Sequence, residues 1–188
     1  MYDPVAREYA EQFRDELAGK PFDRALLDSV AARCRGGVIA DLGCGPGQVG
    51  RYVGAGVGLD RSFEMLRLVP FPAVHGDLRA LPFADGSLAG IVAFYCYIHI
   101  EELGVAFADA RRALRPGGVF VLSVHEGDEG WLHRDEWYDK PIDIWVRLWS
   151  KAEIDDAVVA AGFTIESSVI RESYEGELFP RLYVTAVA

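Results

Sequence analysis

Three glycines lie close together near the start of the chain, directly after an aspartate. Gly43, Gly45 and Gly47 follow Asp41, which itself comes after a short apolar run at residues 38–40. Glycine allows a tight turn and a close approach of the backbone to a ligand, and the first turn of a following helix offers unpaired N–H groups. The spacing therefore predicts a ligand-binding loop between a strand and a helix.

The glycines alone are compatible with two kinds of ligand, because Gly45 to Gly50 also matches the G-x-G-x-x-G pattern of dinucleotide-binding folds. Two features oppose that match. Asp41 would place a carboxylate beside the pyrophosphate, and like charges repel. The dinucleotide pattern also expects an acid about 20 residues further on, whereas Asp60 is only 15 residues past Gly45. A ligand that carries an ammonium and a sulfonium would instead be attracted to Asp41.

Further motifs follow the glycine stretch in a fixed order. They are Gly58-Leu59-Asp60, Gly76-Asp77-Leu78 and Leu114-Arg115-Pro116-Gly117-Gly118. With the run at 81–88, this ordered set resembles that of the class I, Rossmann-like S-adenosylmethionine-dependent methyltransferases, of the small-molecule type. The resemblance is fullest over residues 3–122 and looser in the remainder.

The resemblance implies S-adenosyl-L-methionine as the cofactor. Asp41 and the loop backbone would hold its methionine part, and Asp60 would accept from the ribose hydroxyls, because a vicinal diol suits an acceptor with two oxygens. Asp77 would accept from the adenine amino group. A solvated loop acid is the alternative reading of Asp60. The residues expected to bind the cofactor are Asp41, Gly43, Cys44, Gly45, Gly47, Asp60, Arg61, Asp77, Leu78 and Tyr95.

Three side chains are candidates for catalysis, namely His99, His125 and Tyr95. Transfer of a methyl group from a sulfonium mainly requires alignment of donor and acceptor, and a base is needed only when the acceptor must lose a proton. The two histidines follow the expected fourth and fifth strands, whose ends open on one cleft, and histidine titrates near neutral pH. Each could equally cap a helix or order a loop. Tyr95 is expected to border the reacting centre.

Alternating apolar strands and helices must position these residues. The pattern predicts an α/β fold: a Rossmann-like, open, mostly parallel sheet of seven strands, the last antiparallel, with helices on both faces. The strands are expected at 38–40, 57–59, 72–75, 88–95, 119–122, 163–170 and 181–188. Helices are expected at 4–17 with Asp3 as cap, at 23–34, 48–53 and 103–114, and after the capping box Ser150-Lys151-Ala152-Glu153.

Two segments are candidates for covering the site. The N-terminal helices within residues 1–34 are a candidate lid. Residues 126–149 contain all four tryptophans and are expected to form an aromatic-rich substrate cover, although a loop anchored on the core and a dimer contact are alternatives. Both segments are expected to belong to a single methyltransferase domain that comprises residues 1–188.

The amino-acid composition of the chain limits the kinds of molecule that it is expected to bind. The formal net charge is −10, and such a surface repels nucleic-acid phosphate and anionic membranes. The stretch Phe94 to Tyr97 also lacks the Asn/Asp-Pro-Pro-aromatic motif of nucleic-acid amino methyltransferases. No apolar run reaches the roughly 20 residues of a membrane helix, and three scattered cysteines form neither a disulfide framework nor a metal site. These features predict a cytoplasmic protein, a monomer or homodimer, that binds no metal, no nucleic acid and no membrane.

The leading hypothesis is a methyltransferase that acts on an O or N atom of a small molecule. A nicotinamide-dependent oxidoreductase is one alternative, supported only by the six-residue glycine match. A non-catalytic S-adenosylmethionine-binding protein is the other. The sequence leaves the acceptor open.

Overall fold

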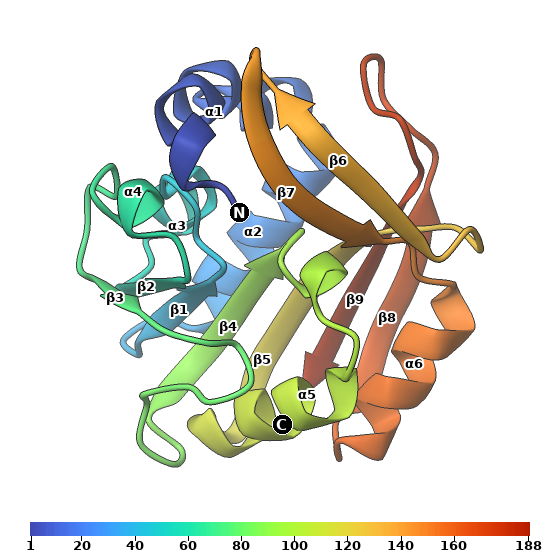
Figure 1. Ribbon diagram of the computed structural model, residues 1–188. Helices are drawn as coiled ribbons and strands as arrows, with labels where there is room; N and C mark the ends of the chain where they lie inside the picture. Colours follow the sequence, from blue (N-terminus) through green and yellow to red (C-terminus); the bar gives the residue numbers. More distant parts are fainter.

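A seven-stranded sheet in the order β3-β2-β1-β4-β5-β9-β8 forms the centre of the molecule (Figure 1). The computed structural model describes all residues, 1–188. The first five strands in this order pair in parallel, whereas β9 runs antiparallel to both of its neighbours, which confirms the predicted fold class. The strands are β1 Ile39–Leu42, β2 Val57–Asp60, β3 Ala73–His75, β4 Leu88–Phe94, β5 Leu114–His125, β8 Thr164–Arg171 and β9 Arg181–Val187.

Helices cover both faces of this sheet because alternate residues of its central strands point to opposite sides. Every residue of β4 is buried. Its Ile91 packs in the cluster that contains α5 (Leu103–Ala113) and α6 (Lys151–Ala160), whereas Val92 packs in the cluster with α2 (Pro21–Arg33) and α3 (Gln48–Val53). This two-sided burial explains why the strand is a continuous apolar run.

The N-terminal segment departs from the expected single helix at 4–17. It forms a 3₁₀ turn η1 (Asp3–Val5), the helix α1 (Ala6–Phe13) and a second 3₁₀ turn η2 (Glu16–Gly19). Asp3 does not cap its own helix. Its Oδ1 instead accepts from Ser62 Oγ at 2.5 Å and from the Glu64 N–H at 3.1 Å, and so supports the first turn of α4 (Phe63–Leu66). The sequence pattern could not show this contact because its partners lie far along the chain.

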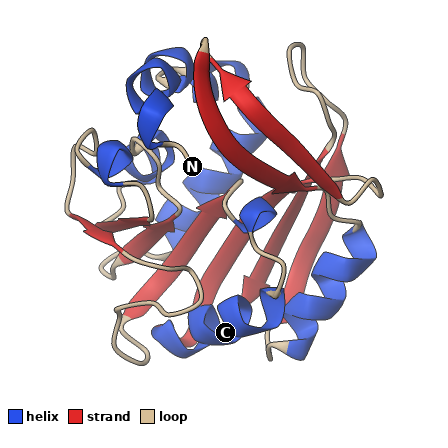
Figure 2. Ribbon diagram, in the orientation of Figure 1, coloured by secondary structure: helices blue, strands red, loops and turns tan.

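The segment after β5 forms a hairpin that the sequence did not predict. Strands β6 (Trp131–Trp137) and β7 (Lys140–Arg147) pair antiparallel, and Tyr138 and Asp139 form the turn with φ of 54° and 56°. Positive φ at both positions is typical of a type I′ turn, which Asn-Gly usually signals. The hairpin lies near the carboxyl end of β4, on the side of the molecule where the parallel strands end (Figure 2).

Smaller features agree with the sequence. The predicted capping box begins α6, with the Ser150 N–H donating to Glu153 Oε2 at 3.0 Å. A short 3₁₀ turn, η3 (Tyr97–His99), follows β4. No helix of the protein is both long enough and apolar enough to cross a bilayer.

Candidate functional site

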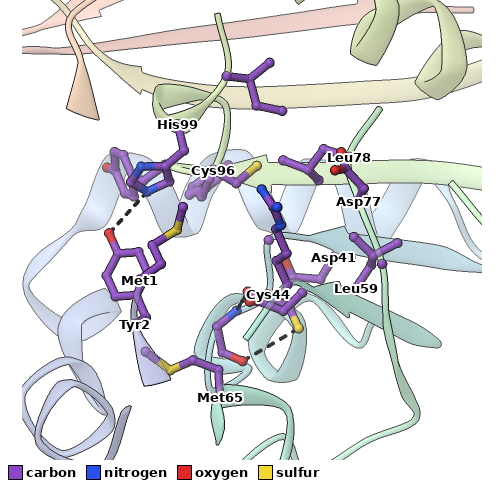
Figure 3. Close-up of a pocket in the computed structure, with 18 of the residues that line it drawn as sticks. Met1, Tyr2, Asp41, Cys44, Leu59, Met65, Asp77, Leu78, Cys96 and His99 are labelled. Carbon is purple, nitrogen blue, oxygen red and sulfur yellow. Dashed lines mark hydrogen bonds between the residues drawn. The ribbon is translucent and has the colours of Figure 1, made fainter. Parts of the chain in front are cut away.

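A cavity of about 550 Å³ opens at the carboxyl ends of β1, β2 and β4 (Figure 3). In an open parallel sheet ligands bind at this edge, where the strand order reverses. Most of the predicted site residues line the cavity: Asp41, Gly43, Cys44, Gly45, Asp60, Arg61, Asp77, Leu78, Tyr95 and His99. Gly47 and His125 do not line it. Gly47 lines a neighbouring cavity of about 240 Å³ on the other side of the loop.

The glycine loop requires its glycines for two different reasons. Gly43 has a φ of 63°, and a Cβ there would lie 2.2 Å from the Cβ of Cys96, so a side chain would displace the chain that follows β4. Gly47 has a φ of 89° and caps α3. The loop thus brings its backbone close to the cavity without side chains that would fill it.

Asp41 holds the loop to the helix that follows it. Its side chain is only 2% exposed, and its Oδ2 accepts from the Gly50 N–H at 2.8 Å. Burial, with a smaller contribution from Asp60, raises the pKa of the Asp41 carboxyl to about 8. The carboxyl is therefore mostly uncharged at neutral pH in this structure, which the sequence pattern could not indicate.

Asp60 ends β2 with both carboxylate oxygens oriented by the backbone. Oδ2 accepts from the Gly45 N–H and Oδ1 from the Ser62 N–H, each at 2.8 Å. A carboxylate oxygen has two lone pairs, so each keeps one for a further donor. Two adjacent hydroxyls of a ligand fit this arrangement.

Asp77 forms an ion pair that the sequence analysis missed. Arg79 donates from Nε to Asp77 Oδ1 at 2.9 Å and from Nη2 to Oδ2 at 2.7 Å. These hydrogen bonds lower the pKa of Asp77 to about 2. Arg79 and Leu78 line the cavity beside it, so a ligand here meets a charged pair as well as the predicted acid. The Asp-x-Arg spacing was the available signal.

The hydrogen bonds of His99 identify its tautomer. Nδ1 lies 2.7 Å from the carbonyl oxygen of Trp145, and a carbonyl can only accept, so Nδ1 carries the proton. Nε2 is then an acceptor and lies 3.2 Å from the hydroxyl of Tyr2; the two side chains point toward each other in Figure 3. Burial lowers the pKa of His99, so at neutral pH it presents a lone pair in the cavity wall.

His125 lies behind Tyr95 rather than in the cavity. The two rings stack with centroids 5.4 Å apart. Burial, followed by the charge of Arg181, lowers the pKa of His125 to about 3, so it cannot accept a proton near neutral pH. Tyr95 lines the cavity with a strained φ of 58°, and burial raises its pKa to about 12. Its hydroxyl lies 3.4 Å from a carboxylate oxygen of Asp23.

The four tryptophans have separate roles. Trp131 lines the cavity, whereas Trp149 packs in the main core. Trp137 packs edge-on against Tyr9 of α1 at 5.6 Å, which joins the hairpin to the N-terminal segment. Trp145 is 49% exposed and stacks on a surface histidine.

Several residues that line the cavity were not singled out from the sequence. Two of them are Glu16, from the N-terminal segment, and Gln48, from α3. Their signal was weak, because these positions have no fixed spacing from the glycine loop.

Comparisons with known proteins agree with this geometry. Residues 40–122 match the family model described as a methyltransferase domain. Over this segment the chain is similar to methyltransferases, in line with the resemblance to the class I S-adenosylmethionine-dependent methyltransferases. S-adenosyl-L-methionine is the cofactor that this similarity supports. The cavity fits this group, because the glycine loop leaves room for it and Asp60 keeps two lone pairs for a ribose diol.

Two curated relatives illustrate the similarity in sequence. An uncharacterized 37.1 kDa protein in transposon TN4556 of Streptomyces fradiae is 34% identical over 140 residues, which cover 66% of this chain and 40% of that protein. The malonyl-[acyl-carrier protein] O-methyltransferase of Xylella fastidiosa is 36% identical over 105 residues, which cover 48% of this chain and 36% of that protein. The chain thus spans less than half the length of these two relatives.

A solved structure extends the likeness in fold to nearly the whole chain. The 1,6-didemethyltoxoflavin-N1-methyltransferase of Burkholderia thailandensis, with 1,6-didemethyltoxoflavin and S-adenosylhomocysteine bound, superposes with a TM-score of 0.73 at 22% identity. The match covers 98% of this chain and 84% of that chain.

Proposed function

We propose that this chain transfers a methyl group from S-adenosylmethionine to an oxygen or nitrogen atom of a small molecule. The observation that carries the proposal is the shared cavity. One part of its wall has the glycine loop and Asp60, and another has the unprotonated Nε2 of His99. Donor and acceptor could therefore meet in one enclosed space, as an in-line transfer requires.

The proposed cofactor contacts follow from the hydrogen-bonding groups that remain free in the cavity wall. Asp60 would receive the ribose hydroxyls, and the loop backbone at Gly43 to Gly45 would lie against the methionine part. Asp77 and Leu78 would border the adenine, with Arg79 holding the carboxylate of Asp77 in place. Bound there, the cofactor supplies a methyl group on a sulfonium, which is already an activated leaving group.

His99 is the proposed proton acceptor when the methyl acceptor is a hydroxyl or an amine. The acceptor atom loses one proton as it gains the methyl group, and Nε2 of His99 can take it if the Tyr2 hydroxyl gives way. The carbonyl of Trp145 keeps Nδ1 in place and stabilises the imidazolium that forms. The proton then leaves to solvent, which restores the neutral ring.

The charge of the cavity favours a neutral or cationic acceptor. Five acidic residues besides the mostly uncharged Asp41 line it, against the two arginines Arg61 and Arg79. An anionic acceptor would be repelled by this excess. The related proteins include an O-methyltransferase and an N-methyltransferase, in keeping with a proposal that includes both atoms.

Two segments are proposed to cover the site, and both belong to the single domain proposed for residues 1–188. Residues 1–34 would act as a lid, because Tyr2 contacts His99 and Asp3 contacts Ser62 on another part of the rim. Residues 126–149 would cover the acceptor, with Trp131 in the cavity wall. The proposed setting is the cytoplasm, as a monomer or homodimer without nucleic acid, in keeping with the net charge of −10.

The cofactor test is calorimetric titration with S-adenosylhomocysteine. Wild-type protein should bind it, and Asp60→Asn should weaken binding at least tenfold, because an amide both replaces one acceptor oxygen and removes the charge. The matched control is Asp128→Asn, at an exposed loop position. Protection from unfolding by nicotinamide dinucleotides, and none by S-adenosylhomocysteine, would favour the oxidoreductase alternative instead.

The catalytic test measures release of S-adenosylhomocysteine with a panel of small alcohols, phenols and amines. His99→Asn should lower the rate with such acceptors, while Asp156→Asn, at an exposed position of α6, should not. Binding of the cofactor without turnover of any acceptor would support the non-catalytic alternative.

A further inference from the structure

We propose that Glu16 is the carboxylate that recognises the ammonium group of the cofactor, and that Gln48 positions it. This inference rests on the proposed cofactor site. It assigns a role to the N-terminal segment that goes beyond covering the cavity, and it moves the cation-binding role away from Asp41.

Glu16 lies at the same end of the cavity as the glycine loop. It begins η2, lines the cavity, and its side chain is 13% exposed. Its Oε1 accepts from Nε2 of Gln48 at 2.9 Å, and Gln48 is the residue directly after Gly47 of the loop. A side chain from the N-terminal segment is thereby held against the loop that approaches the methionine part of the ligand.

The carboxylate of Glu16 is paired with a cation, and its two oxygens are only partly used as hydrogen-bond acceptors. Its Oε2 forms an ion pair with Lys20 at 3.1 Å, and Lys20 also lies 3.4 Å from Glu177. Each oxygen of Glu16 therefore has one partner and keeps a second lone pair. A ligand ammonium that reaches these lone pairs would form a charge-assisted hydrogen bond in a half-enclosed site, where such bonds are strong.

The other acids near the loop suit this role less well. The Asp41 carboxyl is buried, accepts from the Gly50 N–H and is mostly uncharged at neutral pH. Asp60 lies at the end of β2, where its geometry suits two hydroxyls. Glu16 is the acid that combines an ion pair, a free lone pair on each oxygen and a place beside the loop.

The orientation of Gln48 gives a second, independent observation. Because the carboxylate of Glu16 can only accept, the amide nitrogen of Gln48 faces it, and Oε1 points elsewhere. That oxygen is buried and has no hydrogen-bond partner. A buried acceptor without a donor is costly, and an ammonium has three donors. A small rotation of the amide would let one ligand group satisfy both Glu16 and Gln48.

The test compares two ligands that differ only where Glu16 is proposed to act. S-adenosylhomocysteine carries the amino-acid end, whereas 5′-methylthioadenosine keeps the adenosine and the sulfur but lacks that end. Calorimetric titration of Glu16→Gln should show S-adenosylhomocysteine bound about tenfold to a hundredfold more weakly than by wild type, the range expected for a charge-assisted hydrogen bond. The affinity for 5′-methylthioadenosine should be unchanged.

Two further variants complete the design. Gln48→Leu should weaken S-adenosylhomocysteine by a smaller factor, because Glu16 loses its positioning partner but keeps its charge. Glu172→Gln should change neither affinity, because Glu172 is exposed and lies outside the cavity and outside both covering segments. Unchanged binding of 5′-methylthioadenosine also shows that each variant is folded.

The outcomes separate this inference from the proposed cofactor site. Equal losses for both ligands, or no loss for S-adenosylhomocysteine in Glu16→Gln, would overturn the role of Glu16 and leave the cofactor site standing. A wild-type chain that bound neither ligand would overturn both.

Discussion

Replacing Asp41 with asparagine removes one titratable group from the end of β1 while keeping the size of the side chain. Asp41 is 2% exposed, and its Oδ2 accepts from the Gly50 N–H at 2.8 Å. The amide oxygen of asparagine can accept the same hydrogen bond. The variant therefore mimics the protonated carboxyl at every pH, and the comparison with wild type isolates the ionisation of this one residue.

The expected effect depends on the direction of the pKa shift. Burial raises the pKa of Asp41 to about 8, whereas an aspartate in an unfolded chain titrates near 3.9. Between these values the folded state binds the proton and the unfolded state does not. The stability that protonation contributes is thus fully present below about pH 4 and is lost as the pH rises toward 8.

The size of the change in the free energy of unfolding follows from the same pH range between the two pKa values. Each pH unit within it costs the wild-type protein about 1.4 kcal/mol, and the slope flattens near the folded pKa. From pH 6 to pH 8 the wild type should lose about 2 kcal/mol that Asp41→Asn retains. For a chain of this length that corresponds to a difference of about 4–8 °C in Tm. Other buried acids, such as Asp23 with its raised pKa, titrate alike in both proteins and cancel.

The assay is thermal unfolding followed by circular dichroism at pH 6 and pH 8, at constant ionic strength and without cofactor. Asp41→Asn should gain stability relative to wild type as the pH rises. Asp128→Asn, at an exposed position, should track wild type at both pH values. A difference between wild type and Asp41→Asn that stays constant with pH would refute the argument that this carboxyl is buried and protonated.

Three other expectations are direct to check. Ser150→Ala should lower the free energy of unfolding by about 1 kcal/mol, measured by urea titration, because it removes the cap shared with Glu153; an unchanged midpoint would contradict the capping role. Trp131→Phe should reduce the change of tryptophan fluorescence on addition of S-adenosylhomocysteine, because Trp131 is the tryptophan that lines the cavity; a change as large as that of wild type would place the ligand elsewhere. His125→Leu should leave the pH profile of methyl transfer between pH 6 and pH 9 unchanged, because the pKa of His125 is about 3; a shifted profile would show that this imidazole titrates in the active range.

The local parts of the site could be predicted because local chemistry controls them. The alternation of glycines after Asp41 indicated a loop, and positive φ at Gly43 and Gly47 is what such a loop requires. The apolar run of β4 indicated a strand buried on both faces. The sequence also places an acid at the end of β2, where Asp60 accepts from two backbone N–H groups.

The hairpin and the N-terminal contacts could not be predicted in the same way. The turn of the hairpin uses Tyr138 and Asp139 instead of the usual glycine, so no turn signal marks it. Asp3 has the residue type and position of a helix cap, but its carboxylate finds donors at Ser62 and Glu64. Those donors lie about sixty positions further along the chain, and only folding brings them together.

The sequence by itself determined the fold class and the glycine-rich loop between β1 and α3, because hydrophobic periodicity, turn chemistry and motif order are local properties. Only the tertiary structure decided which titratable groups are charged and which reach the cavity. In the sequence, His99 and His125 each follow an expected strand and could not be distinguished. In the structure, His99 lines the cavity and His125 stacks behind Tyr95. Burial and neighbouring charges control a pKa, and both depend on residues that are close in space and distant in sequence.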